Sequence, residues 1–414
     1  MRLRVAHVTP RYVPAPLTGS ERYIDAMTKY LAAVGHSVDV ITSFAVDWKS
    51  TMSIRGRKTL GSISVNNKLR VYRVAIHYEL KELSRILYKL SNVNSVSAPA
   101  VLRNYFRLMR LGPCMPGVYY KLIKGDYDII NTTPYPFSYN WYVYMASKKT
   151  GTPLVLTPFF HYHIREYYNP LLVLMLREAD AVIAFTEFEA NLLRRLGAKR
   201  IHMSAMGLWM SEWRDVRGDG VLEELGLDKD YFVVIIPHRL PLKGSCQVLK
   251  ASILLKRYGV KVAAVSFGQF TYREYEWWAS VARKFGVKVV DLGYVSEEFK
   301  RKLLASADVL AQPSIADAYG LVYLEAWAVG RPVVAARTKA MMSIVKDGVD
   351  GFLVRFNDHR ELADKLLLLA RNPDVAIEMG RKGREKVLRN NDWAVIGRKL
   401  ENLYREVIER RKAA

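Results

Sequence analysis

Short apolar runs alternate along the chain with longer stretches in which apolar residues recur every three or four positions. The short runs fit buried strands and the longer stretches fit amphipathic helices. Strands that alternate with helices are typical of parallel sheets built from βαβ units. In the first half, the strands are predicted at Val5–Thr9, Ser37–Thr42, Arg70–Ile76, Asp128–Asn131, Leu154–Thr157, Ala181–Phe185 and Ile201–Met203. The helices are predicted at Glu21–Val34, Leu80–Leu90, Ala100–Leu111, Ser138–Thr150 and Glu187–Leu196.

A polar segment at residues 211–220 interrupts the pattern and predicts a linker, after which a second alternating series begins. Its strands are predicted at Tyr231–Pro237, Val260–Phe267, Lys288–Leu292, Val309–Gln312, Pro332–Ala336 and Gly351–Val354. Its helices are predicted at Ser245–Tyr258, Thr271–Phe285, Glu297–Ala305, Leu321–Val329, Glu361–Ala370, Ala376–Arg389 and Trp393–Arg410. We therefore expect two doubly wound, Rossmann-like α/β domains, residues 1–208 and 209–390, that face each other across a cleft.

Length and composition agree with this division. The chain has 414 residues, which is long for a single core, and half of them are hydrophobic. The two cysteines, Cys114 and Cys246, lie in no metal-binding pattern. The first ten residues favour a strand over a signal peptide, and no apolar run approaches the roughly 18 residues of a membrane span. We expect a cytoplasmic protein.

The formal net charge of +23 is concentrated in part in residues 81–124, which carry eight basic side chains and one acid. Arg103, Arg107 and Arg110 recur at helical spacing among apolar residues. Such an amphipathic basic stretch can lie on an anionic membrane surface, on the inner face of the cell membrane. Nucleic acid is a competing partner, but no nucleic-acid-binding motif accompanies the charge, so none is expected. A solvated helix face in a basic protein is the third explanation.

The segment Gln312–Ala336 combines a loop, a glycine and an apolar helix behind a buried strand. Asp317 lies on the loop and Glu325 lies in the helix. The first-turn amides of such a helix, together with its dipole, suit an anion such as a diphosphate. Carboxylates on both sides of the anion suit the hydroxyls of a sugar and a ribose. The simpler alternative is an amphipathic helix with solvated acids.

The segment Pro237–Gly244 follows the first strand of the second domain, where parallel sheets present their ligand loops. Arg239 and Lys243 lie four positions apart there, and Gly244 ends the turn. Two fixed cations can neutralise a diphosphate leaving group, so no metal cofactor is expected. Two surface cations beside a turn would be the alternative.

Other strand ends carry candidates of lower specificity. Gly293 allows close backbone approach, and Tyr294 could border a flat base. Gly19 and Ser20 are expected on a loop just before the helix at Glu21, where they can approach substrate phosphates. His161 follows a predicted strand and faces the expected cleft; a structural histidine is the alternative. No Cys or carboxylate stands at metal-ligand spacing from it, so no metal is expected.

The order of these motifs resembles that of retaining glycosyltransferases of family 4, also grouped as glycosyl transferases group 1, which have the two-domain GT-B fold. The resemblance rests on PSIADAYGLVYLEAWAVGRPVV at Pro313–Val334, HRLPLKG at His238–Gly244, GHSVDVIT at Gly35–Thr42 and ADAVIAFTEFEANLLRRLGA at Ala179–Ala198. It also implies that the final segment, residues 391–414, packs back on the first domain.

The resemblance implies a role for each candidate residue. Arg239 and Lys243 would bind the donor diphosphate, while Asp317 would contact the donor sugar and Glu325 the ribose. The amides of Gly320, Leu321 and Val322 would meet phosphate and sugar, and His161 would lie near the reacting sugar. Four departures stand out: Asp317 where glutamate is usual, Tyr319 where phenylalanine is usual, three residues between Arg239 and Lys243 where one more is common, and MGLW at 206–209 in place of the usual N-G-[VI]-D.

The sequence thus predicts a metal-independent, retaining glycosyltransferase. Its donor would be a nucleotide diphosphate-sugar, UDP- or GDP-linked, and its acceptor a lipid-linked or glycan hydroxyl at the cytoplasmic membrane face. The alternatives are a soluble transferase that makes a small glycoside and a non-catalytic protein that binds a nucleotide-sugar.

Overall fold

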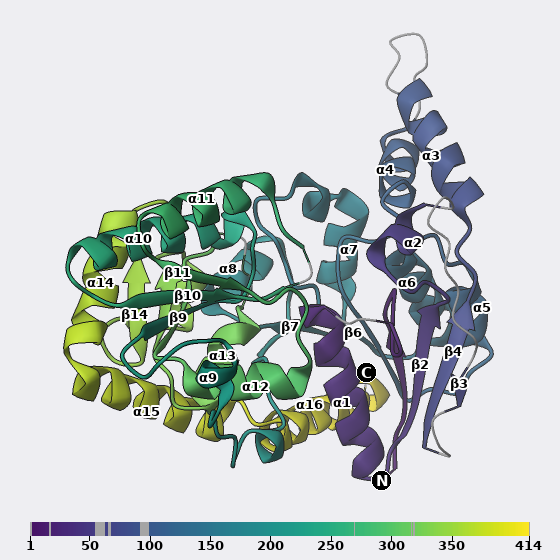
Figure 1. The fold of residues 1–414 in the computed structure, drawn as a ribbon. Coiled ribbons are helices and arrows are strands. Elements are labelled where there is room, and N and C mark those ends of the chain that lie inside the picture. Colours follow the sequence, from purple (N-terminus) through teal and green to yellow (C-terminus); the bar gives the residue numbers. More distant parts are fainter. Residues whose placement is uncertain are drawn as a thin grey trace. The chain divides into compact units, whose positions relative to one another are not determined.

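The computed structural model describes residues 2–413 except 16–17, 54–62, 65–67, 92–98, 269, 316 and 318. The chain divides into two compact units (Figure 1). The first comprises Met1–Ser204 together with Ile396–Ala414, and the second comprises Ala205–Val395. The polypeptide therefore passes from one unit to the other twice, near residue 204 and near residue 395.

The first unit is built on an eight-stranded sheet with the order β3-β4-β2-β1-β5-β6-β7-β8. All neighbouring strands run parallel except β3 and β4, which pair antiparallel. The order reverses between β1 and β5, so this is the topological switch point. The strands are β1 Arg4–Val8, β2 Ser37–Ser43, β3 Ile63–Ser64, β4 Leu69–Val74, β5 Ile129–Thr132, β6 Leu154–Leu156, β7 Ala181–Ala184 and β8 Ile201–Met203.

Helices flank this sheet and bury its apolar residues. Local sequence sets several helix starts: Asn169 caps a helix that continues with Pro170, and the Thr186 hydroxyl accepts the backbone N–H of Glu189. The helices are α1 Gly19–Ala33, α2 Trp48–Met52, α3 Tyr78–Leu90, α4 Ala100–Met109, α5 Gly117–Ile123, α6 Tyr139–Thr150, α7 Pro170–Glu178 and α8 Glu187–Arg195.

The last helix, α16 (Trp393–Ala413), joins the first unit through a buried polar network. The Tyr404 hydroxyl accepts a hydrogen bond from Asn131 Nδ2 at 2.7 Å and lies 3.1 Å from His7 Nε2. His7 Nδ1 in turn lies 2.7 Å from the Thr28 hydroxyl, and burial lowers the pKa of His7 to about 3. His7 on β1 and Asn131 on β5 flank the switch point, so α16 is fixed to the centre of the sheet.

The second unit has a six-stranded parallel sheet with the order β11-β10-β9-β12-β13-β14. The order reverses between β9 and β12. The strands are β9 Phe232–Ile236, β10 Val262–Ser266, β11 Lys288–Asp291, β12 Val309–Gln312, β13 Val333–Ala336 and β14 Gly351–Val354. The helices are α9 Val221–Glu224, α10 Ser245–Arg257, α11 Arg273–Lys284, α12 Glu297–Ser306, α13 Leu321–Ala328, α14 His359–Arg371 and α15 Pro373–Asn390, with short 3₁₀ turns η3 Met210–Glu212, η4 Pro241–Lys243 and η5 Met341–Ser343.

Each predicted strand and helix has a counterpart in the structure, with ends that differ by a few residues. The pattern missed the short elements α2, β3, α5 and α9, which are too brief for a periodic signal, and it also missed α7. The expected linker at 211–220 contains part of η3. Among the described residues, no helix has the length and apolar character needed to cross a bilayer.

We predict that Tyr404→Phe lowers the free energy of unfolding by about 1–3 kcal/mol, because it leaves the buried amide of Asn131 without its acceptor. Urea unfolding followed by circular dichroism measures the change. The matched control is Tyr120→Phe, since the Tyr120 side chain is exposed and its loss of a hydroxyl should change stability by no more than about 0.5 kcal/mol. Equal unfolding midpoints for the two variants would contradict the structural role of the network.

Candidate functional site

The switch point of the second sheet brings together two loops that are far apart in the sequence. β9 and β12 are hydrogen-bonded neighbours, yet the connections that follow them lead to opposite sides of the sheet. Open α/β sheets bind ligands outside the carboxyl ends of such strands, and we call this region the β9–β12 crevice. The loop after β9 carries Arg239 and Lys243, and the loop after β12 carries Asp317.

Lys243 and Asp317 form an ion pair in this crevice. The Lys243 ammonium donates to Asp317 Oδ1 at 2.5 Å, and Gln312 Nε2 donates to the other carboxylate oxygen at 2.9 Å. Both side chains are largely buried. Burial by itself would raise the pKa of Asp317, but the Lys243 charge and the hydrogen bonds outweigh it and hold this pKa below its ordinary value. Asp317 is therefore a fixed negative charge at neutral pH.

Backbone contacts hold the same two loops together. The amide of Ile315 donates to the carbonyl of Leu242 at 3.2 Å. Gly244 has a φ of +81°, and a Cβ atom there would lie 2.6 Å from the carbonyl oxygen of Pro313. Only glycine meets both requirements, the left-handed backbone and the close approach. The turn that carries Arg239 and Lys243 therefore packs against the loop that leads into α13.

Helix α13 begins at the end of this loop, so its N-terminus lies beside the turn after β9. Gly320 caps the helix in the left-handed region, and the amides of Leu321 and Val322 lie in the first turn, where a helix offers no internal acceptor. Tyr323 fixes this geometry, because its hydroxyl donates to the carbonyl of Gln312 at 2.5 Å. The helix mouth and the Lys243–Asp317 pair therefore border one crevice.

Glu325 lies one turn further along α13 and is buried. Its Oε1 accepts from the Lys300 ammonium at 2.7 Å, and Lys300 also contacts Glu297 at 2.8 Å. Its Oε2 is buried with no hydrogen-bond partner among the described residues. A buried carboxylate oxygen without a donor is costly, and such an oxygen can accept a hydrogen bond from a ligand hydroxyl.

Arg239 and Gly293 are linked through Gly268. Arg239 Nη2 donates to the carbonyl of Gly268 at 2.6 Å, and the amide of Gly268 donates to the carbonyl of Gly293 at 2.7 Å. Three successive loops, after β9, β10 and β11, are thereby held side by side. The Tyr294 side chain is 78% exposed and contributes no packing to the unit.

The remaining candidates belong to the first unit. His161 lies on the loop after β6, partly buried, with its ring centre 5.6 Å from that of Tyr167. Gly19 and Ser20 were expected on a loop before the helix, and this is wrong: α1 begins at Gly19. The helix starts early because the Glu21 carboxylate accepts the backbone N–H of Thr18 at 2.8 Å and caps the first turn.

Sequence reasoning missed two residues that hold the site. Lys300 stands on the apolar face of α12 with Leu303 and Leu304, and a lysine in that position signals a buried charge in need of a partner. Gln312 ends β12, and neither its charge nor its spacing marks it. Both touch a predicted site carboxylate, Glu325 or Asp317.

Sequence reasoning also missed a contact between the loop before α13 and the segments around residues 206–208 and 391. These segments lie next to the two points where the chain passes between the units. Asn391 Nδ2 donates to the Tyr319 hydroxyl at 2.9 Å and to the carbonyl of Met206 at 2.8 Å. The amide of Leu208 donates to the carbonyl of Asn391 at 2.8 Å. Tyr319, one of the departures from the family pattern, thus uses its extra hydroxyl in a defined hydrogen bond.

The arrangement suits a doubly charged anion flanked by hydroxyls. An ammonium and the helix amides face the anion position, and Glu325 supplies an acceptor one turn away. Within the described part of the chain, no group of three or more His, Cys, Asp or Glu side chains could hold a metal ion.

Comparisons with known proteins cover both units. Residues 18–209 match the family described as glycosyl transferase 4-like domain, and residues 221–386 match the family described as glycosyl transferases group 1. The chain is 37% identical over 117 residues to the phosphatidyl-myo-inositol mannosyltransferase of Mycobacterium leprae, a stretch that covers 28% of this chain and 31% of that protein. It also matches the putative glycosyltransferase EpsD of Bacillus subtilis, of which it spans about half the length.

Solved structures match over nearly the whole chain. The sucrose-phosphate synthase of Thermosynechococcus elongatus has a TM-score of 0.74 at 19% identity, covering 99% of this chain and 100% of that one. Anabaena HepE in complex with UDP and glucose has a TM-score of 0.70 at 19% identity, covering 98% and 100%. At this identity, the likeness establishes the two-domain Rossmann-like fold.

We predict that Gly320→Ala destabilises the protein by about 1–3 kcal/mol beyond the cost of a positive φ, because its Cβ would lie 2.3 Å from the Tyr323 ring. Gly226→Ala is the matched control, with a similar φ of +66° and no atom within 4 Å of the added Cβ. Thermal melts of both variants measure the difference. Equal losses would show that the α13 mouth tolerates the collision.

Proposed function

The chain belongs to the family 4 glycosyltransferases with the GT-B fold, and from that premise we propose that it moves a sugar from a nucleotide diphosphate-sugar to an acceptor hydroxyl. The observation that carries this proposal is the Lys243–Asp317 pair beside the mouth of α13. A positive side chain, the first-turn amides of α13 and a fixed carboxylate meet there.

The donor diphosphate would bind between Lys243 and the amides of Leu321 and Val322. An ammonium has three N–H donors, and Asp317 occupies one of them, so two remain for phosphate oxygens. Asp317 also keeps the ammonium aimed at one position. Charge that develops on the leaving diphosphate is thereby stabilised by groups already in place, which is the efficient form of electrostatic catalysis.

We propose that transfer proceeds with retention and without a metal. The bond between the anomeric carbon and the diphosphate oxygen breaks, and the acceptor oxygen forms its bond on the same face of the sugar. The acceptor proton passes to the departing phosphate oxygen, so a side-chain base is not required. Arg239 would add a second cation once its contact with Gly268 is exchanged for phosphate. His161 stays a predicted contact near the reacting sugar.

The unpartnered Oε2 of Glu325 supports recognition of the nucleoside ribose, with Lys300 holding the carboxylate in place. Gly293 and the exposed Tyr294 lie on the neighbouring loop and would border the base. The likeness to HepE in complex with UDP and glucose supports a uridine donor, with a guanosine donor as the second choice.

The helices α3 and α4 support an acceptor presented at an anionic membrane, on the cytoplasmic side. They pack on each other and extend from the carboxyl ends of β2 and β4 (Figure 1). Leu83, Ile86 and Leu90 lie three to four residues apart along α3, and each is about half exposed. Exposed apolar residues at helical spacing, next to cations, suit insertion between lipid headgroups.

Not all of the basic side chains in residues 81–124 would face such a membrane. Lys81 donates to the carbonyl of Met52, while Arg110 and Lys121 lie over the rings of Tyr88 and Tyr72. These three cations serve the fold of the unit. Lys89 and Arg103 are exposed and remain for lipid phosphates.

We predict that Lys243→Ala lowers kcat/KM for the accepted sugar donor by about 100- to 1,000-fold, because it removes the charge that faces the leaving group. The donor is first found by thermal shift across UDP-, GDP- and ADP-sugars, since a ligand of the folded state raises the melting temperature. Lys261→Ala, a surface lysine of the same unit that pairs with Asp228, should keep full activity.

The double variant Lys243→Ala/Asp317→Asn separates catalysis from folding. It removes the unpaired buried carboxylate left by the single change, so stability should recover while turnover stays low. Near-normal turnover in either variant would rule out the proposed role of Lys243. The anomeric configuration of the product, read by NMR, tests retention.

We predict that Leu83→Gln/Ile86→Gln reduces sedimentation with phosphatidylglycerol vesicles by about tenfold or more, since each side chain is about half exposed and would lose about half of the ~1.5–3 kcal/mol of a fully buried apolar side chain. Leu368→Gln/Ile377→Gln removes exposed apolar residues from α14 and α15 and should leave binding unchanged. Equal binding by both pairs, or none by the wild type, would refute the α3–α4 membrane surface and favour a soluble transferase for small acceptors.

A further inference from the structure

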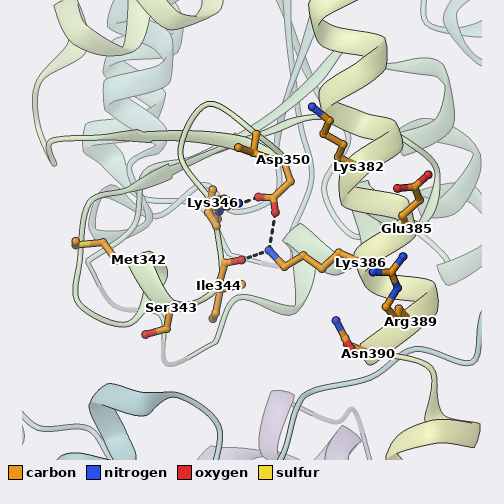
Figure 2. Close-up of a pocket in the computed structure, with 12 residues that line it drawn as sticks. Met342, Ser343, Ile344, Lys346, Asp350, Lys382, Glu385, Lys386, Arg389 and Asn390 are labelled. Carbon is orange, nitrogen blue, oxygen red and sulfur yellow. Dashed lines mark hydrogen bonds and ion pairs between the residues drawn. The ribbon is translucent and has the colours of Figure 1, made fainter.

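A second cavity lies in the second unit, apart from the β9–β12 crevice. It has a volume of about 600 Å³ and lies between α15 and the segment that runs from η5 to β14 (Figure 2). None of the residues assigned above to the donor lines it. Cavities of about 300–1,000 Å³ hold small organic ligands.

Buried interactions fix the two walls of this cavity to each other. Lys386 on α15 donates to Asp350 Oδ2 at 2.7 Å and also to the carbonyl of Ile344 (Figure 2). Its ammonium lies 4.4 Å from the ring centre of Trp327, and the Trp327 indole N–H donates to the carbonyl of Asp350 at 2.6 Å. The two walls of the cavity are thus fixed to each other through Lys386, Asp350 and Trp327.

The charges around the cavity are unequal. Four cations line it, Lys346, Lys382, Lys386 and Arg389, against two carboxylates, Asp350 and Glu385. Both carboxylates are already paired within the unit: Asp350 binds Lys386 and the amide of Lys346, and Glu385 binds Arg381. The cations that line the cavity thus outnumber its carboxylates by two.

Lys346 and Arg389 have no ion pair or side-chain hydrogen bond among the described residues, and they border the cavity from opposite walls. Among the side chains that the structure describes, Lys382 forms an ion pair only with Glu378, at 3.5 Å. Like charges that converge without a counterion repel one another, and a polyvalent anion relieves this repulsion. Arginine and lysine together suit phosphate oxygens, one by its planar fork and the other as a point charge.

Two apolar side chains lie at the rim of the cavity. The Met342 side chain is exposed at the edge of the cavity, and Val349, which also lines it, is partly exposed. Such side chains can cover the carbon skeleton of a ligand whose charged end lies near Lys346 and Arg389.

We propose that this cavity is a binding site for a phosphate monoester with a small organic group, such as a sugar phosphate. The phosphate would lie between Lys346, Lys382 and Arg389, and the organic part would rest against Met342. The site is separate from the donor crevice, so it would take its ligand whether or not transfer occurs. Asn390, at its edge, directly precedes Asn391, which binds Tyr319 and Met206.

The test is calorimetric titration of the full chain at low salt with glucose 6-phosphate, with inorganic phosphate, and with glucose as the uncharged control. We expect saturable binding of both phosphates and none of glucose. Lys346→Ala/Arg389→Ala should weaken the binding by about tenfold or more, since it removes two charge-assisted contacts. Both side chains are exposed and unpaired, so the variant should melt like the wild type.

Two controls make the result specific. Lys229→Ala/Lys284→Ala removes the same charge from exposed positions of the same unit and should bind as the wild type does. Lys243→Ala should also bind normally, since it alters only the donor crevice. Loss of phosphate binding in Lys243→Ala but not in Lys346→Ala/Arg389→Ala would assign the phosphate to the donor crevice and overturn the proposal. Absence of saturable binding would overturn it as well.

A lipid could supply the same phosphate chemistry, and vesicles tell the two sources apart. In the Leu83→Gln/Ile86→Gln background, sedimentation with phosphatidic acid vesicles that depends on Lys346 and Arg389 would identify a lipid phosphate. Binding of glucose 6-phosphate without such sedimentation would identify a soluble one.

Discussion

The ion pair between Lys243 and Asp317 is the contact on which the candidate site depends. These residues are 74 positions apart in the chain, and they meet only because β9 and β12 are neighbours whose connections diverge. Each side chain alone would be a costly charge in a crevice. Paired, they fix a positive group beside the α13 mouth. The close approach of Gly244 to Pro313 makes this geometry reproducible, because no larger residue fits there.

The two units use their switch points in opposite ways. In the first, His7 and Asn131 lie within the sheet and close on the Tyr404 hydroxyl, so that all three polar groups are satisfied inside the protein. In the second, the polar groups lie beyond the strand ends, and some of them, such as Glu325 Oε2, remain unmatched. The closed arrangement holds a helix, and the open one is the candidate ligand site. A buried polar group without a hydrogen-bond partner lowers the stability of the folded protein. Its position therefore marks a candidate binding site.

Most of the fold and part of the site could be predicted from the sequence. The alternation of apolar runs and helical periodicity located every long strand, and the glycine before the apolar helix at Leu321–Val329 located the α13 mouth. Short helices such as α5 were missed because a few residues carry too little periodicity. Lys300 and Gln312 were missed because a buried polar residue is recognised by its partner, and the partner is distant in sequence. The start of α1 was misplaced because a side-chain cap from Glu21 decided it.

The sequence alone determined the repeated strand–helix order, the basic turn after β9, and the carboxylates around an amide-rich helix mouth. These follow from local rules, since periodicity and backbone conformation depend on neighbouring residues. Only the tertiary structure decided that Lys243 meets Asp317, that Glu325 rests on Lys300, and that a second cationic cavity forms between α15 and the segment before β14. Which charge lies next to which is set by strand order and helix packing, and no local pattern encodes that adjacency.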